Sequence, residues 1–488
     1  MGKGQQQDNH SDRLLGPIDR RALLTGTTAL GAASLLGTPT IGQTAPAAGA
    51  EPANTLPGRG EFVVRGAHVL TMDYKIADLP GGDVHVRDGV IVAVGASVIA
   101  PGAQVIDGKD MICMPGFVDT HWHLWTSMLR PAMRADDPKR TYFPVTFALG
   151  LHYTPRDSYL SVRLGLAEAI SAGVTTTHNW AHNVRSPAHA DAEIRAMRDS
   201  GIRGRFAYGP SLGMPNEEPM NIADWARVKK DLANDPLLSL GICSRNIDGN
   251  NTKRGAINAD MAKREWTAAR ALGLPITLHT SGSDSIQLLV ANNLLGPDVQ
   301  LVHPLNTNAA DWAVLAKTGT HYSTSPLGEA ARSGEMQFND MMHAGVPMSM
   351  SIDNVTAEPC NCFGCMRMLQ TINRHRSGGK LSLTTKRLVQ LATIDGARDL
   401  GLADKTGSLT PDKRADLILV RAHAPNMTAD GDPYDALVQL AQPANIDTVV
   451  ADGRIMWRNG AFTALDYGQI KREAGQALAA LEARAKWT

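Results

Sequence analysis

Helical and extended hydrophobic patterns alternate through the middle of the chain, between residues 114 and 403. Apolar residues recur at helical spacing in several segments, and most of these segments end at a glycine or short turn before a β-branched or apolar run. Such repeats are typical of parallel βα units, and including the first apolar run gives eight strands. The sequence therefore predicts an α/β fold with a (β/α)8 TIM barrel. The predicted strands are 111–118, 174–178, 203–208, 238–243, 275–278, 299–302, 320–323 and 346–352, and the predicted helices are 156–172, 191–200, 260–272, 283–292, 309–317 and 336–343.

Short alternating strands dominate the regions on both sides of the barrel. Residues 61–113 contain β-branched runs with an Asp88-Gly89 turn, and residues 404–465 contain similar runs with Asp452-Gly453. Asp-Gly pairs favour tight hairpins. The two regions together predict a small composite β-sandwich domain built from both chain ends. Residues 466–488 are predicted to form a C-terminal helix.

The first fifty residues have the pattern of an export signal. Arg20-Arg21 precedes a mildly apolar stretch, residues 25–37, and then small-residue, proline-containing sequence. A charged region, a short apolar region and Ala-x-Ala-like sites are typical of secretory signals, and paired arginines indicate the twin-arginine class. We therefore expect residues 1–50 to be a twin-arginine-type signal peptide and linker. The export machinery is then a partner, and the mature protein is periplasmic or secreted.

Composition and charge exclude several functional classes. The 488 residues contain 48 Lys+Arg and 48 Asp+Glu, so no basic excess marks a nucleic-acid partner. No apolar run is long enough to span a bilayer, so no membrane partner is expected for the mature form. A small molecule is the expected partner, and the sequence is compatible with a homo-oligomer.

Three of the five cysteines form a Cys-x-Cys-x-x-Cys motif: Cys360, Cys362 and Cys365. Structural zinc sites usually need four ligands, and no second ligand pair accompanies this motif. A second metal site is therefore not predicted. A disulfide within the trio and plain loop thiols both stay open.

Ligand-forming side chains follow four of the predicted strands. His121 and His123 come after the first strand, and residues i and i+2 of a strand share a face. His279, His303 and Asp353 follow three later strands. Because the carboxyl ends of barrel strands converge at one mouth, these groups are expected to meet there. Four imidazoles and a carboxylate predict a site for one divalent metal with an acid/base beside it.

At these residues the chain resembles the amidohydrolase superfamily, in the branch that includes cytosine deaminase, S-adenosylhomocysteine deaminase and triazine hydrolases. The resemblance covers roughly residues 60–465. Its most specific segments are Met114-Pro115-Gly116-Phe117-Val118-Asp119-Thr120-His121-Trp122-His123 and Gly407-Ser408-Leu409-Thr410-Pro411-Asp412-Lys413-Arg414-Ala415-Asp416-Leu417-Ile418.

The resemblance implies a role for each of these side chains. It makes His121, His123, His279 and Asp353 the metal ligands and Asp353 also the acceptor of the proton from water. It makes His303 a polarising or proton-handling residue that is occasionally a ligand. The strand 238–243 carries no lysine, so the bridging carbamate of two-metal relatives is absent. One metal is therefore expected, zinc first and iron second.

One departure from the family pattern affects the expected reaction. Deaminases of this branch usually carry a glutamate three residues after the histidine of the fifth strand, where it protonates a ring nitrogen. Here that position is Gly282. Attack on a carbonyl needs such an acid less, because the metal and His303 can stabilise the oxyanion. The main prediction is therefore an exported metal-dependent hydrolase of a non-peptide C–N bond (amide, carbamate or urea type) in a small, aromatic molecule. The alternatives are an aminoheterocycle deaminase, a lactone hydrolase and, more remotely, a binding protein that keeps the metal but has lost turnover.

Aromatic side chains near the strand ends suggest the walls of the substrate pocket. Trp125 lies just past the His-x-His pair, and Trp180 and His182 follow the second strand. Ligand pockets are commonly lined by apolar and aromatic side chains. We therefore predict that these three residues bind substrate.

Overall fold

The structure is a computed structural model in which residues 56–248, 255–280, 282–303, 305–330, 336–379, 382–427 and 431–487 are described. They lie within one compact unit. The predicted signal peptide, residues 1–50, falls outside the described residues, so it stays a prediction. No helix of the described part is both long enough and apolar enough to cross a membrane.

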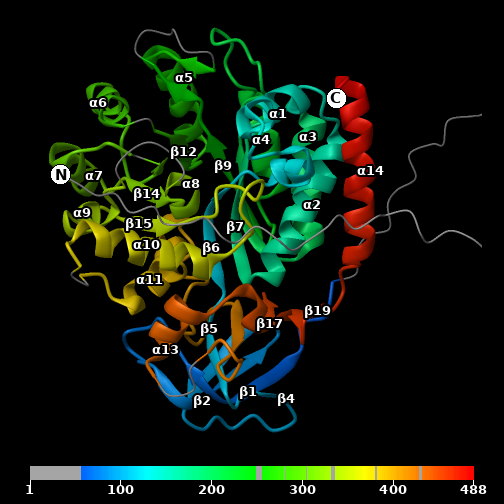
Figure 1. The fold of residues 1–488 in the computed structure, drawn as a ribbon, viewed down its shortest axis with the longest axis vertical. Helices are drawn as coiled ribbons and strands as arrows, with labels where there is room; N and C mark the ends of the chain where they lie inside the picture. The colour runs from blue at the N-terminus through cyan, green and yellow to red at the C-terminus, as the bar shows by residue number, and fades with distance from the viewer. Residues whose placement is uncertain are drawn as a thin grey trace, which may run out of the picture. The chain divides into compact units, whose positions relative to one another are not determined.

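The centre of the fold is an eight-stranded parallel sheet that curls into a nearly closed barrel (Figure 1). A parallel bridge between Trp122 and Asp353 joins the first strand to the end of the last. The predicted (β/α)8 architecture is confirmed. In order along the sheet, the strands are β15 (Met348–Met350), β14 (His321–Thr324), β13 (Val299–Val302), β12 (Ile276–His279), β9 (Leu238–Cys243), β8 (Arg203–Tyr208), β7 (Val174–Ala181) and β6 (Phe117–Trp122).

Helices of the barrel layer follow the strands, and two of them end where the sequence places a glycine. Gly201 and Gly319 adopt left-handed φ values of 74° and 67° as the caps of α3 and α7. This conformation lets glycine end a helix without steric cost. The helices of this region are α2 (Pro155–Ser171), α3 (Pro187–Ser200), α4 (Ile222–Asp231), α5 (Ala259–Ala271), α6 (Ser283–Ala291), α7 (Ala309–Thr318), α8 (Pro326–Ala330), α9 (Phe338–His343), α10 (Cys362–Arg376), α11 (Thr385–Leu391) and α12 (Ile394–Asp399).

The predicted first strand, residues 111–118, is two strands in two different sheets. β5 (Met111–Pro115) pairs antiparallel with β16 (Leu417–Arg421), whereas β6 pairs with β7 in the barrel. Gly116 stands at the break, and a Cβ there would lie 2.2 Å from Thr175 Oγ1. An uninterrupted apolar run hides this break, because both strands are buried. The barrel strand therefore extends to Trp122, and His121 lies within it.

Both chain ends contribute to a separate nine-stranded mixed sheet, in which blue N-terminal strands lie beside orange C-terminal strands in Figure 1. The predicted domain from both ends is thus found, as one continuous hydrogen-bonded sheet with a core of its own around Phe62, Val84 and Leu417. Its strands are β1 (Glu61–Val69), β2 (Leu79–Arg87), β3 (Val90–Gly95), β4 (Gln104–Asp107), β5, β16, β17 (Ile446–Ala451), β18 (Arg454–Arg458) and β19 (Ala461–Phe462).

The remaining elements lie outside these two sheets. The predicted C-terminal helix is α14 (Tyr467–Ala485), which runs along α2 (Figure 1). Three short helices precede α2: η1 (Leu124–Ala132), η2 (Pro138–Arg140) and α1 (Tyr142–Gly150). Three others lie nearer the C-terminus: α13 (Pro433–Asp435), η3 (Ala436–Leu440) and η4 (Pro443–Asn445). Two short strands pair with each other, β10 (Asn246–Ile247) and β11 (Ala256–Ile257).

A partly buried cluster of charges joins the nine-stranded sheet to the barrel. This junction cluster consists of Arg59, Arg203, Arg414, Asp416, Asp452 and Arg454. Arg203, the first residue of β8, donates to Asp416 at 3.0 Å and to Asp452 at 3.3 Å. Asp452 also accepts hydrogen bonds from the other three arginines. Burial raises the pKa of Asp452, but these arginines outweigh burial and hold the pKa below its ordinary value.

The cysteine trio belongs to the packed interior. Cys360, Cys362 and Cys365 are buried free thiols beside and within the first turn of α10, so the alternative of a disulfide is not found. Burial raises the pKa of all three thiols. Their side chains pack within the hydrophobic core, and among the described residues they are not part of a group that could hold a metal ion.

Candidate metal centre and substrate cavity

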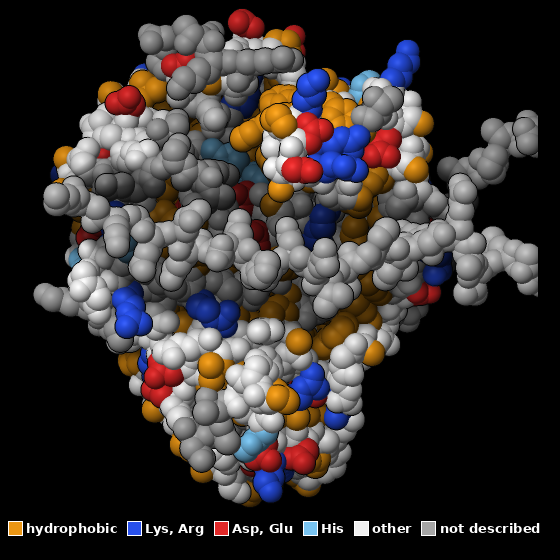
Figure 2. All heavy atoms as spheres, viewed as in Figure 1, with side chains coloured by type: hydrophobic (Ala, Val, Ile, Leu, Met, Phe, Trp, Pro, Cys, Tyr) orange, Lys and Arg blue, Asp and Glu red, His pale blue; other side chains and the backbone are white. Residues whose placement is uncertain are grey.

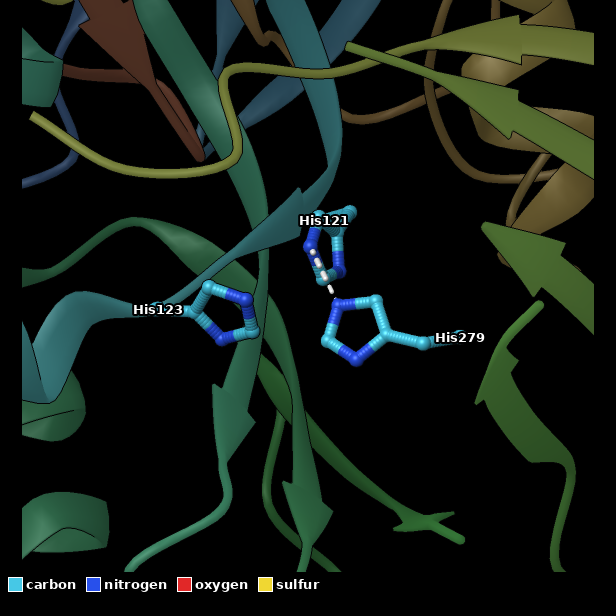
Figure 3. A group of neighbouring side chains, drawn as sticks. All are labelled: His121, His123 and His279. Carbon is cyan, nitrogen blue, oxygen red and sulfur yellow. Dashed lines mark hydrogen bonds between the residues drawn. The ribbon is translucent and has the colours of Figure 1, made fainter. Parts of the chain in front are cut away.

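Three histidines from two strands face one another at the mouth of the barrel (Figure 3). His121 lies in β6, His123 follows it directly, and His279 ends β12. The Nε2 atoms of His121 and His279 are 3.3 Å apart. Ligand atoms of all three histidines lie within 4.8 Å of one another. The structure therefore brings together the three imidazoles that the sequence predicts as ligands.

Asp353 adds a carboxylate to this group because its backbone closes the barrel. Its N–H donates to His121 O at 2.8 Å, and its carbonyl accepts from His123 N at 2.7 Å. Its Oδ1 then lies 3.5 Å from His121 Nε2 and 3.4 Å from His123 Nε2. Asp353 has a φ of 71°, a left-handed conformation that is uncommon outside glycine. Such strain is often found at functional sites.

The chemistry of these donors fits a divalent metal ion. Burial, with smaller contributions from neighbouring histidines, lowers the pKa of His123 and His279 well below the ordinary value. Both imidazoles are therefore neutral near pH 7 and keep a lone pair for a cation. His123 Nδ1 and His303 Nε2 are buried ring nitrogens without a hydrogen-bond partner among the described residues. Neutral imidazoles with one carboxylate are the donor set that zinc prefers.

His303 joins the cluster from β13, and a residue that the sequence did not reveal holds it there. Its Nδ1 lies 2.8 Å from Glu329 Oε1, and its Nε2 lies 3.7 Å from Asp353 Oδ2. Glu329 is buried on α8 and also accepts from Thr324 Oγ1 at 2.7 Å. His121, His303 and Asp353 form a second potential ligand group within 4.8 Å. Glu329 belongs to a five-residue helix, too short for a periodic signal in the sequence.

A cavity of about 360 Å³ opens above the histidines. In Figure 2, hydrophobic side chains gather over the region of α1, beside a hollow in which histidine is visible. The aromatic part of the lining comes largely from α1, which the sequence analysis missed. The lining residues of the described chain are His123, Tyr142, Phe143, Thr146, Phe147, Trp180, His182, Pro210, Ser211, Leu212, Gly213, Met214, Cys243, Ser244, Arg245, Asn246, Gly255, His279, Thr280, His303 and Asp353.

Of the three residues predicted to bind substrate, Trp180 and His182 line this cavity and Trp125 does not. Trp125 is fully buried behind His182, and its indole N–H donates to His182 Nδ1 at 3.1 Å. The prediction placed Trp125 on the wall because it follows the His-x-His pair. The turn of η1 instead directs its ring under α1. Burial lowers the pKa of His182 to about 4.

Arg245 is the charged side chain that the sequence analysis did not anticipate in the cavity. It follows β9 and is held by Glu265 and by the carbonyls of Pro215 and Glu218. Its positive charge is therefore balanced by the buried carboxylate of Glu265. Arg245 shapes the wall between β9 and the loop after β8.

Gly282 occupies the position where related deaminases carry the ring acid. Its φ of 106° and ψ of −165° lie in a region that side-chain-bearing residues rarely adopt. A Cβ there would also lie 3.1 Å from Leu305 O. Asp284, two residues later, is exposed in the first turn of α6 and outside the cavity lining. The local backbone is therefore built for glycine, and no carboxylate replaces the missing one from this turn.

A model of the amidohydrolase family matches residues 112–456. The chain belongs to this family. The amidohydrolase is 29% identical over 443 residues to 5-methylthioadenosine/S-adenosylhomocysteine deaminase of Symbiobacterium thermophilum, a match that covers 86% of this chain and 99% of that protein. It is 25% identical over 443 residues to 5'-deoxyadenosine deaminase of Methanosarcina mazei, covering 87% and 99% of the two chains.

Solved structures support the same fold. An adenosine deaminase from Xanthomonas campestris with bound zinc superposes with a TM-score of 0.76 at 20% identity, covering 88% of this chain and 100% of that chain. Atrazine chlorohydrolase from Arthrobacter aurescens, complexed with zinc, has a TM-score of 0.71 at 18% identity and covers 86% and 100%. At this identity the likeness concerns the fold alone.

Membership of the family gives the reaction class. The protein is an amidohydrolase, an enzyme that acts on carbon–nitrogen bonds other than peptide bonds, which confirms that prediction. The main prediction within this class was hydrolysis of an amide, carbamate or urea. The relatives favour its alternative, deamination of an aminoheterocycle.

Proposed function

We propose that the protein is a zinc-dependent hydrolytic deaminase that replaces the exocyclic amino group of an aminopurine-like heterocycle by oxygen. The observation that carries this proposal is the convergence of His121, His123, His279 and Asp353 at the base of an aromatic-walled cavity. Curated relatives matched over nearly their whole length act as deaminases of adenine-containing nucleosides. The bound zinc of related structures supports the choice of metal.

Asp353 is placed to move the proton that the reaction requires. Its carboxylate lies 3.4 Å from His123 Nε2 and 3.7 Å from His303 Nε2, beside the ligand group. When bound, the metal acts as a Lewis acid that lowers the pKa of water from 15.7 toward ~7. Asp353 accepts a proton from the attacking water and returns it to the departing amine, as general acid–base catalysis requires. His303, oriented by Glu329, lies next to this path.

The cavity walls suit a flat, weakly polar ring. Trp180, Tyr142 and Phe143 are among the aromatic residues that line the cavity, and Ser244 and Thr280 add hydroxyl groups to the lining. Aromatic rings stack on planar heterocycles, and a few polar groups set their orientation. A purine-sized ring therefore finds both apolar surface and hydrogen-bonding groups.

Gly282 favours a second candidate function. Hydrolysis of an amide, carbamate, urea or lactone carbonyl proceeds without a ring acid, and the glycine backbone at this position leaves that acid out. A non-catalytic binding protein is the remaining alternative, and it predicts metal without turnover.

One experiment separates these functions. Purified protein is analysed for metal and then incubated with 5'-deoxyadenosine, 5'-methylthioadenosine and S-adenosylhomocysteine, and with an aryl amide, an aryl carbamate and a lactone. We expect about one zinc per chain and ammonia release from an aminopurine, with the ultraviolet shift from amino to oxo purine. Asp353→Asn is expected to keep the metal and lose the ammonia. Turnover of the carbonyl compounds without ammonia from any aminopurine would overturn the proposal in favour of the second candidate.

We also propose export through the twin-arginine pathway, from Arg20-Arg21 and the stretch that follows. Residues 1–55 fused to a folded reporter should direct it out of the bacterial cytoplasm, and replacing both arginines by lysine should retain it inside. A reporter that stays inside with the native arginines would contradict export.

A further inference from the structure

His182 and Trp125 form a pair in which one residue reaches the cavity and the other is hidden behind it. The His182 ring is partly exposed in the cavity, and its centroid lies 4.2 Å from that of His123. Trp125 is fully buried and packs edge-to-face on His182, at 5.2 Å between ring centroids. The pair therefore links the protein interior to a side chain that adjoins the predicted ligands.

The hydrogen bond between these residues fixes the tautomer of His182. An indole N–H can only donate, so the nitrogen that receives it, His182 Nδ1, must carry a lone pair. The same Nδ1 lies 3.3 Å from Trp180 O, to which it could donate only if it carried a proton. The N–H of His182 Nδ1 would then face the indole N–H of Trp125, and two donors would oppose each other. Trp180 O already accepts from His182 N at 3.0 Å. His182 is therefore neutral with its proton on Nε2.

His303 has a different kind of partner from His182. Its Nδ1 lies 2.8 Å from Glu329 Oε1, an acceptor, so Nδ1 carries a proton. The internal hydrogen bond from Trp125 instead leaves Nε2 of His182 as the nitrogen that carries the proton. Gly282 itself has no side chain and supplies no group.

We propose that His182 donates a hydrogen bond from Nε2 to the substrate, at the acceptor atom next to the attacked carbon, and that Trp125 is the positioning residue that keeps this proton in place. The proposal rests on the proposed function, in which that acceptor is a ring nitrogen. Charge develops on this atom as water adds to the neighbouring carbon. A fixed donor in a water-poor site stabilises such charge without reorganisation. His182 thereby takes part of the role that the missing glutamate has in related deaminases.

The surroundings of Trp125 suit a positioning role. Its carbonyl accepts from Ser161 Oγ of α2 at 2.7 Å and from Tyr153 Oη, just before α2, at 2.9 Å, and these two bonds hold its backbone. A Cβ on Gly150 of α1 would lie 3.1 Å from the indole ring. The ring is thus packed against α1, and its N–H donates to His182.

The first test reads the tautomer without any substrate. Zinc-loaded full-length protein labelled with ¹⁵N-histidine is examined by long-range ¹H–¹⁵N correlation, with the His182 signals assigned by their loss in His182→Gln. The wild type is expected to show the proton on Nε2. In Trp125→Phe the proton is expected to move to Nδ1, where Trp180 O can accept it. The matched control is Trp225→Phe, which removes a buried indole on α4 whose Nε1 has no partner in the described structure. A wild-type proton on Nδ1 would overturn the proposal, even if Trp125→Phe failed to fold.

The second test reads catalysis on the aminopurine that wild type turns over fastest. His182→Ala and Trp125→Phe are expected to lower kcat on the order of 10²-fold, the usual cost of one preorganised donor. KM should change little, and Trp225→Phe should behave as wild type. His182→Gln keeps an N–H donor and should recover part of the lost kcat. Equal kcat for His182→Ala and wild type would refute the donor role. If wild type turns over no aminopurine while the Nε2 proton is found, the proposed function fails and the tautomer assignment stands.

Discussion

The mouth of the barrel and the junction cluster at its opposite end bury charge in contrasting ways. At the junction, Asp452 accepts from four arginines, and Asp416 shares Arg203 with it. At the mouth, imidazole nitrogens face one another at 3.3 Å and lie within reach of a single carboxylate. The junction therefore satisfies its charges within the chain, whereas the mouth is completed by a cation from outside.

This difference separates stability from function along the same strands. Removing one partner of a buried ion pair leaves an uncompensated charge and destabilises strongly. Removing a catalytic group lowers the turnover rate. It changes the free energy of unfolding little, because residues of an active site are arranged for function and not for stability. Conservation of the two ends would thus serve different purposes, as is general for barrel enzymes.

The largest effect is expected from Asp353→Asn at the mouth. Because the amide cannot take the proton from water, turnover should fall by about 10²–10⁴-fold. The free energy of unfolding should stay within ~1 kcal/mol of wild type, since the amide keeps the backbone hydrogen bonds that close the barrel. Ammonia release and urea unfolding measure the two quantities. The control is Asp340→Asn. Asp340 lies on α9, and its carboxylate pairs with Arg376 at 3.1 Å. If Asp353→Asn lost much stability and kept normal turnover, the mouth would serve stability, and the contrast with the junction would be wrong.

At the junction, Asp452→Ala should lower stability and leave turnover unchanged. It leaves the buried guanidinium of Arg203, and three half-buried ones, without their shared carboxylate, which costs on the order of 3–5 kcal/mol. The kcat of the remaining folded enzyme should be unchanged, because the cavity lining contains none of these arginines. Urea unfolding provides the measurement. The matched control is Asp231→Ala, which removes an exposed partner of Arg198 and should cost no more than ~1 kcal/mol. If turnover falls as far as stability, the two ends are coupled.

Gly116→Ala tests the break between β5 of the nine-stranded sheet and β6 of the barrel. A Cβ there meets Thr175 Oγ1 at 2.2 Å, and this overpacking should cost about 1–3 kcal/mol. Gly475→Ala on α14 is the control, because nothing lies within 4 Å of its Cβ. That change should be neutral or stabilising by about 0.4–1 kcal/mol. Thermal unfolding of both variants, measured together, decides whether the tight approach at Gly116 matters.

The last effect depends on pH and concerns Glu193, a buried acid on α3 that belongs to neither end. Its carboxylate accepts from Asn179 Nδ2 at 2.9 Å, and burial raises its pKa from 4.5 to about 8. The folded state thus keeps a proton that the unfolded state releases above pH 4.5. The associated stability is complete below that pH and is lost as pH rises toward 8, by about 1.4 kcal/mol per pH unit at most. Glu193→Gln should flatten the stability profile between these values, as urea unfolding across pH would reveal. An unchanged slope would mean that Glu193 is ionised in the fold.

The mouth could be predicted from the sequence to a large extent. His279, His303 and Asp353 each follow a short apolar strand, and parallel strands must bring their ends together. The partners of these residues could not be predicted in the same way. Glu329 reaches His303 from a single helical turn, and Trp125 reaches His182 only because η1 folds under α1. Such contacts depend on loop paths, for which a sequence carries no periodic signal.

The contacts of the junction could not be predicted from the sequence, although Asp452 was placed in a hairpin turn and Arg414 and Asp416 in a family segment. Arg59, Arg203 and Asp452 are far apart in the chain, and each resembles an ordinary surface charge. For a related reason, the first barrel strand was predicted at residues 111–118, whereas it lies at residues 117–122. Hydrophobicity is continuous across Gly116, while the change from one sheet to the other is a matter of backbone geometry.

The pairing of β5 with β16 also sets the order in which the protein can be completed. β5 lies early in the chain and directly precedes His121, yet its antiparallel neighbour begins at Leu417. During synthesis, one edge of β5 must wait until nearly the entire polypeptide has left the ribosome. Until β16 is available, the nascent chain thus leaves one edge of a buried strand unpaired next to its future metal ligands. Truncation of the chain before Leu417 should therefore prevent assembly of the metal site, although all the predicted metal ligands would still be present.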